Sequence, residues 1–110
     1  MIDWNRIRDL HGEFGTDDFG EVFDLYLHEM AGVIEKLRHD PIPDDLESDL
    51  HLLKSSALNI GFSAFSEKCQ TGERQATDGR ADRVDLTAII DCFDQSLSAF
   101  TENLPRKFAA

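Results

Sequence analysis

The residues best suited to chemistry lie in one segment of the 110-residue sequence, which reads SDLHLLKSSALNIGFSAFSEKCQTGE from Ser48 to Glu73. An apolar stripe in helical steps of four, three and four runs through its first part and consists of Leu46, Leu50, Leu53 and Ala57. His51 follows Leu50 directly, so it is rotated by about 100° from the stripe and should lie at its edge or in solvent. Lys54 and Ser55 come three and four residues after His51, on the same side of the helix, and we expect Lys54 to be exposed.

These residue types suit phosphoryl chemistry. An imidazole nitrogen can act as a nucleophile towards an activated phosphoryl group. The product carries added negative charge, for which Lys54 would supply a nearby cation. Ser55 is small enough to leave room for a partner that presents its phosphorylated residue in line. A second group that accepts a hydrogen bond from the other ring nitrogen would fix the tautomer and leave the reactive nitrogen free.

Nearly all of the sequence is expected to be helical, and glycines and prolines delimit the first two helices. Residues 3–11 form a short amphipathic segment, which Gly12 and Gly15 separate from the next. Thr16 can cap a second helix, whose first turn holds two acidic residues that would complement the helix dipole, Asp17 and Asp18. The Asp-Pro-Ile-Pro sequence at 40–43 stops this helix, because proline cannot continue the hydrogen-bond ladder.

Three further helices are predicted after these prolines. The third helix carries the stripe described above and ends at Gly61, which would serve as a left-handed cap. Ser63 can cap the fourth helix, and Asp78 and Gly79 close it. The fifth begins near Asp82 and ends at Pro105. No stretch shows the alternation of apolar and polar residues that is typical of a half-buried strand.

We therefore predict one all-α domain over residues 1–110, an antiparallel up-down-up-down four-helix bundle with a short extra N-terminal helix. Residues 1–12 would form the short helix that covers one end, residues 16–104 the bundle and residues 105–110 a frayed tail. Aromatic residues and both cysteines on the helical stripes are expected in the core: Phe19, Phe23, Phe65, Phe93, Phe100, Cys69 and Cys92.

The segment around His51 resembles the histidine phosphotransfer (HPt) domain of two-component phosphorelays. That family has the approximate pattern His-x-Leu-Lys-Gly-Ser-Ala-x-Asn-x-Gly, followed at helical steps by an apolar residue, a cysteine and an acidic or amide residue. The positions that match in register are His51, Leu53, Lys54, Ser56, Ala57, Asn59, Gly61, Phe65, Cys69 and Glu73. The match covers about a quarter of the chain in detail, and the predicted order of helices agrees over nearly its whole length.

The resemblance implies a role for each site residue. His51 would accept a phosphoryl group, through Nε2, from the aspartate of a response-regulator receiver domain and pass it to another receiver. Lys54 would neutralise the phosphoryl group, Glu73 would accept a hydrogen bond from the other ring nitrogen, and Gly61 would form the turn between the two central helices. The first short helix and the surface around His51 would form the docking patch. Receiver domains are the implied partners, with a hybrid histidine kinase as a further candidate, and the implied state is a monomer.

The sequence departs from the family pattern at two positions beside His51. Ser55 stands where the family usually has glycine, and Leu50 where it often has alanine. Two other functions therefore stay open: an HPt-shaped adaptor that docks or sequesters receivers without transfer, and a histidine kinase fragment that phosphorylates itself. No nucleotide-binding motif is encoded, so we expect a phosphoryl carrier without autokinase activity and without a cofactor. Whether the chain counts as an enzyme is left open.

Composition excludes several other classes of protein. The formal net charge of −11 repels nucleic-acid phosphates and anionic lipid, and no window approaches the roughly 18 to 20 apolar residues of a membrane span. The first residues lack the basic and apolar regions of a secretory signal, so we expect a cytoplasmic protein. The three remaining histidines are His11, His28 and His39. Their spacing in the sequence is not that of metal ligands, so we expect no metal site.

Overall fold

The computed structural model describes the backbone of residues 2–108, and their side chains except those of residues 14, 16, 17 and 104–108. The fold is all-helical, as predicted. Within the described residues there are four α-helices and two short 3-10 helices, with no strand. The α-helices are α1 (Trp4–His39), α2 (Leu46–Asn59), α3 (Ser63–Thr77) and α4 (Leu86–Phe108); the 3-10 helices are η1 (Pro43–Asp45) and η2 (Ala81–Arg83).

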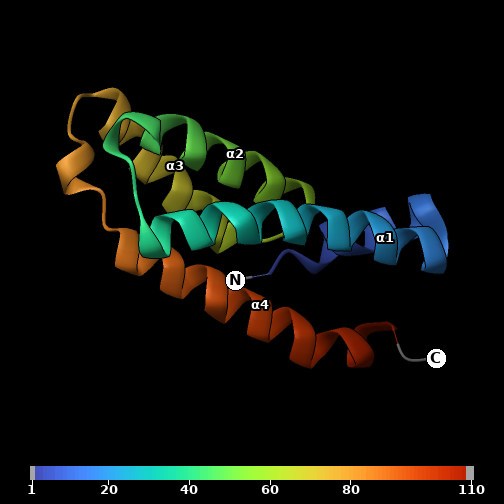
Figure 1. Cartoon of the computed structure of the whole chain (residues 1–110). Helices are drawn as coiled ribbons and strands as arrows, with labels where there is room; N and C mark the ends of the chain where they lie inside the picture. Colours follow the sequence, from blue (N-terminus) through green and yellow to red (C-terminus); the bar gives the residue numbers. More distant parts are fainter. Residues whose placement is uncertain (1, 109–110) are drawn as a thin grey trace.

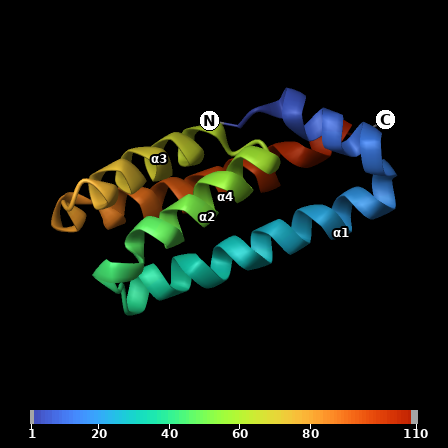
Figure 2. The same cartoon turned by 90° about the horizontal axis from the view of Figure 1, so that it is seen from above.

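The four α-helices run in alternating directions along one elongated axis (Figures 1 and 2). Each packs on two others: α1 and α3 both contact α2 and α4. The resulting body measures 48 × 22 × 19 Å. This arrangement is a four-helix bundle in which α2 and α3, the two helices that carry the predicted site, lie side by side.

Helix α1 is interrupted at Gly15, which has φ +77° and ψ 174°. This backbone conformation is open essentially to glycine alone, so the chain bends sharply there (Figure 2). Gly12, which we expected to help separate two helices, instead lies inside the first helical segment. A helix tolerates an interior glycine at a cost of about 1 kcal/mol, so Gly12 by itself does not break it. The side chains of the predicted cap Thr16 and of Asp17 lie outside the described residues.

The N-terminal segment is fastened to the turn between α2 and α3. Asp3 N donates to Gly61 O at 2.7 Å, and Arg6 Nε donates to Asn59 O at 3.1 Å. Asp3 also caps α1, because its side chain accepts a hydrogen bond from Arg6 N. Ile7 is fully buried, so the segment also contributes to the core. At the other end of α1 the helix stops at His39, before the two prolines, as predicted.

Glycines close the turns that end α2 and α3, as predicted, and both lie in the left-handed region, which was predicted for Gly61 only. Gly61 has φ +81° and Gly79 has φ +78°. After Gly61 the next residue, Phe62, donates its backbone N–H to Ala57 O at 2.9 Å, which satisfies a terminal carbonyl of α2. The prediction that Ser63 caps α3 is wrong by one residue, because Ser63 is the first helical residue and the buried Phe62 holds the N-cap position.

Helix α4 differs from its prediction at both ends. It begins at Leu86, not near Asp82, because Val84 is extended and ends the 3-10 helix that precedes it. Asp85 caps α4 by accepting a hydrogen bond from Ala88 N at 3.0 Å. The helix also continues beyond Pro105 to Phe108. Proline has a fixed φ close to the helical value, and only three residues follow it in α4, so its missing hydrogen bond and its crowding of the preceding turn affect just the last turn of the helix.

The predicted core is confirmed for all seven residues named above, each of which is buried. Its aromatic residues link α1 and α3 to α4. The rings of Phe23 in α1 and Phe100 in α4 stack with their centroids 4.1 Å apart, and Phe65 in α3 contacts Phe93 in α4 edge-on with a centroid distance of 5.3 Å. Both cysteines carry free thiols. Burial raises the pKa of Cys69 to about 12, so its thiol stays protonated at neutral pH.

Candidate functional site

His51 projects from the middle of α2 on the side away from the core. Its side chain is 62% exposed, while its neighbour Leu50 is fully buried. Helical geometry explains this contrast, because consecutive residues are rotated by about 100° and only the Leu50 stripe faces the bundle. The imidazole is thus accessible to a partner, as its position in the helix predicts.

Glu73 reaches across from α3 to the imidazole. The distance from His51 Nδ1 to Glu73 Oε2 is 2.6 Å, short enough for a charge-assisted hydrogen bond. An ionised carboxylate can only accept, so Nδ1 is the nitrogen that carries the proton in this contact. In the neutral imidazole Nε2 then holds the free lone pair.

Lys54 shares the same carboxylate. Its Nζ donates to Glu73 Oε1 at 2.7 Å, so the two oxygens of Glu73 serve two different partners on α2. The Lys54 side chain is only 22% exposed, and our expectation that it is exposed is therefore wrong. The ion pair draws its stem down between α2 and α3, where it lies partly covered.

The electrostatics of this trio favour an ionised Glu73. Burial alone would raise the pKa of this carboxyl group, but the hydrogen bonds from Lys54 and His51, with their positive charges, outweigh burial and hold the pKa below its ordinary value. At neutral pH the site therefore contains an ionised Glu73 carboxylate that is hydrogen-bonded both to the ammonium group of Lys54 and to the exposed imidazole of His51.

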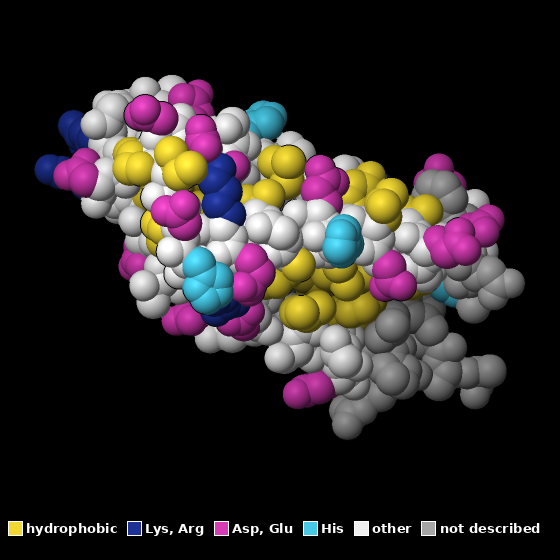
Figure 3. Space-filling model, viewed as in Figure 1, with side chains coloured by type: hydrophobic (Ala, Val, Ile, Leu, Met, Phe, Trp, Pro, Cys, Tyr) yellow, Lys and Arg dark blue, Asp and Glu magenta, His cyan; other side chains and the backbone are white. Residues whose placement is uncertain are grey.

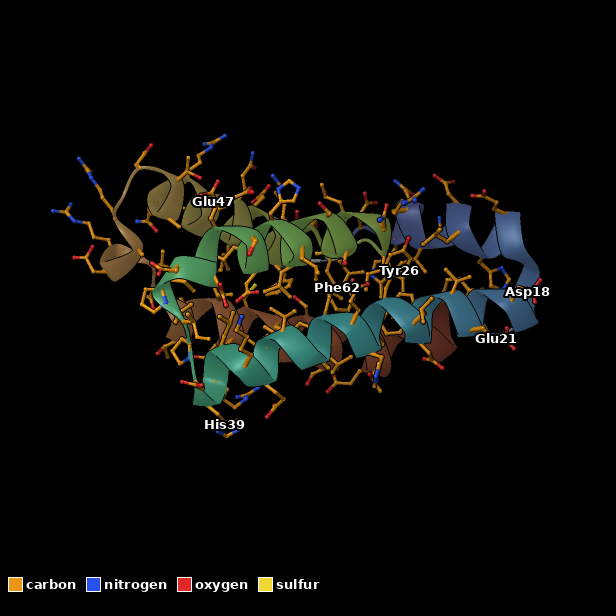
Figure 4. The ribbon with its side chains drawn as sticks, turned by 45° about the horizontal axis from the view of Figure 1, so that its top comes forward. Asp18, Glu21, Tyr26, His39, Glu47 and Phe62 are labelled. Atoms are coloured by element: carbon orange, nitrogen blue, oxygen red, sulfur yellow. The ribbon has the colours of Figure 1, made fainter. Side chains whose placement is uncertain are left out.

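An open groove of about 380 Å³ lies beside the imidazole. Its lining residues come from η1, α2 and α3 and are Asp44, Glu47, Ser48, His51, Leu52 and Glu73. Glu47 is exposed near the start of α2 (Figure 4). On the other side of His51, Ser55 is exposed and Leu58 is 57% exposed. Along α2 the exposed face therefore changes from acidic residues before His51 to a small serine and an exposed leucine after it.

Acidic residues outnumber basic ones in this chain by 22 to 11. Figure 3 shows acidic side chains spread over the face in view, with hydrophobic side chains exposed between them. Within the described residues there is no group of three or more histidine, cysteine or acidic side chains arranged to hold a metal ion. None of the helices, over the same residues, is long and apolar enough to cross a membrane.

The predicted site residues fall into two groups in space. His51, Lys54 and Glu73 come together in one hydrogen-bonded cluster, and Ser55 lies on the exposed face beside it. Gly61 lies apart from this cluster, at the end of α2, where its carbonyl oxygen holds the N-terminal segment.

Sequence reasoning missed two residues that bring α2 and α3 together. Ser66, buried in the first turns of α3, donates its hydroxyl to Lys54 O at 3.3 Å. Gly72, directly before Glu73, is also buried. A glycine inside a helix was a signal that could have found the second, because glycine weakens helices and its presence suggests close packing. Nothing in the sequence distinguishes Ser66 from other helical serines.

Comparison with known proteins places the chain in a family. The family model described as "Hpt domain" matches residues 21–102, which is most of the chain. A search of curated proteins found no match, and neither did a search of solved structures. The matched range includes His51, Lys54 and Glu73 and all of α2 and α3. The chain therefore belongs to the Hpt domain family and has a phosphotransfer role in two-component signalling.

Proposed function

We propose that this protein is a phosphorelay intermediate whose phosphoacceptor is His51. The observation that supports this most strongly is the 2.6 Å contact of Nδ1 with Glu73 on an imidazole that is 62% exposed. One nitrogen is held and protonated, and the other faces solvent with its lone pair available. The exposed His39, by comparison, pairs with Glu35 of its own helix.

The proposed transfer proceeds by displacement at phosphorus. The lone pair of His51 Nε2 attacks the phosphorus atom of a receiver's aspartyl phosphate, the P–N bond forms, and the P–O bond to the aspartate breaks. The aspartate leaves as a carboxylate with the bonding electron pair. Transfer to the next receiver reverses these steps, with its aspartate carboxylate attacking the phosphorus and Nε2 leaving. Glu73 stabilises the positive charge that the ring carries while it is phosphorylated.

Lys54 would supply the positive charge that the phosphoryl group needs. In the unphosphorylated protein its ammonium group is bound to Glu73, one helical turn from His51. The lysine side chain is flexible, so Nζ can swing towards a phosphoryl group on Nε2 without movement of the backbone. The positive charge of Lys54 is thus already close to His51 before the reaction.

The partners follow from this chemistry. Receiver domains that carry an aspartyl phosphate would donate and accept the group, and a hybrid histidine kinase would be one source of such a receiver. We propose that the protein acts in the cytoplasm as a monomer and does not phosphorylate itself from ATP.

Transfer from a phosphorylated receiver tests the proposal directly. The wild-type protein should acquire an acid-labile, base-stable phosphate, and His51→Gln should acquire none. His28→Gln is the matched control, because His28 is an exposed histidine on α1, and it should be labelled like the wild type. Label that persists in His51→Gln, or a wild type that none of the organism's receivers can label, would refute the proposal. Label from ATP alone would point instead to a kinase fragment.

A second candidate function is an adaptor that binds receivers without transfer. The observation that favours it is the exposure of Ser55, whose side chain stands one turn from His51 on the face that a receiver must approach. Binding that is tight, insensitive to His51→Ala and accompanied by no transfer would support the adaptor. If Ser55→Gly then gained transfer activity, the serine would be identified as the obstacle.

A further inference from the structure

Gly72 is a helical glycine in an unusual environment. Most helical glycines in this chain have free space where a side chain would be: a Cβ built on Gly20 or Gly32 would meet nothing within 4 Å. A Cβ on Gly72 would lie 2.9 Å from Leu50 Cδ1, 3.2 Å from Ile89 Cδ1 and 3.3 Å from Val84 Cγ1. Its φ is not positive, so the glycine is needed there for space rather than for its backbone conformation.

The three neighbours enclose Gly72 from three elements. Leu50 belongs to α2, Ile89 to α4, and Val84 to the connection between η2 and α4. Leu50 is fully buried and Ile89 nearly so, which leaves them little room to move aside in a close-packed core. A methyl group at position 72 would therefore push α3 away from α2 or force its neighbours to repack.

The position of this contact in the sequence links it to the site. Leu50 directly precedes His51, and Gly72 directly precedes Glu73. The tight contact between Gly72 and Leu50 thus lies one residue from both partners of the 2.6 Å hydrogen bond. Earlier in α3, Ser66 donates a hydrogen bond to the backbone oxygen of Lys54 and so holds the two helices together at a second point.

We infer that Gly72 is a positioning residue: its lack of a side chain lets α3 lie close enough to α2 for Glu73 to hold His51 and Lys54 at once. Opening the Leu50 contact to an ordinary van der Waals distance of at least 3.4 Å requires that Leu50 Cδ1 or helix α3 shift by about half an ångström, and the buried Leu50 has little room to do so. The same shift between Glu73 and its partners would weaken both hydrogen bonds, which are now 2.6 and 2.7 Å long. Only the consequence for transfer rests on the function proposed above.

The experiment compares Gly72→Ala with Gly32→Ala, an exposed helical glycine with nothing within 4 Å. NMR would report two quantities that do not depend on phosphotransfer: the tautomer of the His51 ring and the pKa of the Glu73 carboxyl group. In Gly72→Ala the pKa of Glu73 should rise towards its ordinary value of 4.5, and the preference for a proton on Nδ1 should weaken. Gly32→Ala should change neither.

Transfer from a phosphorylated receiver is the second readout, and Gly72→Ala should slow it about tenfold relative to Gly32→Ala. A folded Gly72→Ala variant with wild-type Glu73 pKa and His51 tautomer would overturn the inference. If wild-type protein accepts no phosphate, the function proposed above fails, yet the NMR comparison still decides the role of Gly72.

A compensating variant separates positioning from general loosening of the core. Leu50→Val removes a methylene at the closest contact, so the double variant Leu50→Val/Gly72→Ala should recover most of the wild-type Glu73 pKa. The double variant can also be measured in place of Gly72→Ala if the single variant does not fold. A folded double variant in which the pKa of Glu73 stays raised would overturn the inference, because space beside Leu50 would then not control the position of Glu73.

Discussion

Replacing Gly61 by alanine should destabilise the protein much more than the same change at Gly79. Both glycines end helices in nearly the same conformation, with φ of +81° and +78°. Their surroundings differ, because a Cβ at Gly61 would lie 2.6 Å from Asp3 O and 3.2 Å from Ile7 Cγ1, whereas a Cβ at Gly79 would meet nothing within 4 Å. The pair therefore separates the cost of the backbone conformation from the cost of the contact.

The magnitude follows from these two contributions. An alanine in the left-handed region costs about 1–2 kcal/mol, and this is the whole expected effect of Gly79→Ala. In Gly61→Ala the backbone oxygen of Asp3 must also move, which threatens the hydrogen bonds Asp3 N to Gly61 O and Arg6 Nε to Asn59 O. At about 1 kcal/mol for each hydrogen bond, we expect Gly61→Ala to cost about 3–4 kcal/mol in total.

Thermal unfolding followed by circular dichroism would measure both variants under the same conditions. In a domain of this size each kcal/mol corresponds to roughly 4–8 °C in melting temperature, so the difference between the variants should be easily resolved. Amide hydrogen exchange in residues 4–14 should also become faster in Gly61→Ala only, because this segment loses its anchor. Equal destabilisation by the two substitutions would refute the claim that Gly61 is the attachment point of the N-terminal segment.

Three further predictions concern the site and the core. Lys54→Ala should slow phosphotransfer roughly tenfold or more and shorten the lifetime of the phosphorylated form while the fold stays intact; Lys68→Ala, an exposed lysine on α3, is its control, and equal rates would show that the Lys54 charge is not used. The lowered pKa of Glu73 contributes stability that is present above pH 4.5 and is lost as the pH falls through the lower, folded-state value, so Glu73→Gln should flatten the decline of the unfolding free energy below about pH 4.5; an unchanged slope would contradict the ion pairs. Cys69→Ser should cost about 1–3 kcal/mol in thermal unfolding because it buries a hydroxyl group, and an unchanged melting temperature would contradict its fully buried position.

Most of the helices could be predicted from local sequence patterns, because the spacing of apolar residues and the backbone preferences of glycine and proline act over only a few residues. The step of three or four between apolar residues places Leu50 in the core and His51 outside it, whatever the partners of the helix are. Glycine and proline stop or bend the chain through their own backbone geometry, which is why the ends of α1, α2 and α3 were predictable. The errors at Ser63, Asp82 and Pro105 all concern helix ends, where competing local conformations differ little in energy.

The candidate site was predictable in its parts, but its assembly was not. The register of residues from His51 to Glu73 indicated which side chains to consider. Lys54 and His51 bind the same carboxylate, and this contact draws Lys54 out of solvent. Both features depend on the separation of α2 and α3. This separation is decided by what lies between the helices, and the sequence alone does not show that Gly72 faces Leu50.

The amino-acid sequence by itself thus determined the helical elements, the buried faces and the exposed position of His51, since all of these follow from backbone preferences and the period of the helix. Only the tertiary structure decided the distances across the helices, the attachment of the N-terminal segment to Gly61, and the shared use of Glu73. These features depend on close packing between residues far apart in the chain, where half an ångström separates a strong hydrogen bond from a weak one.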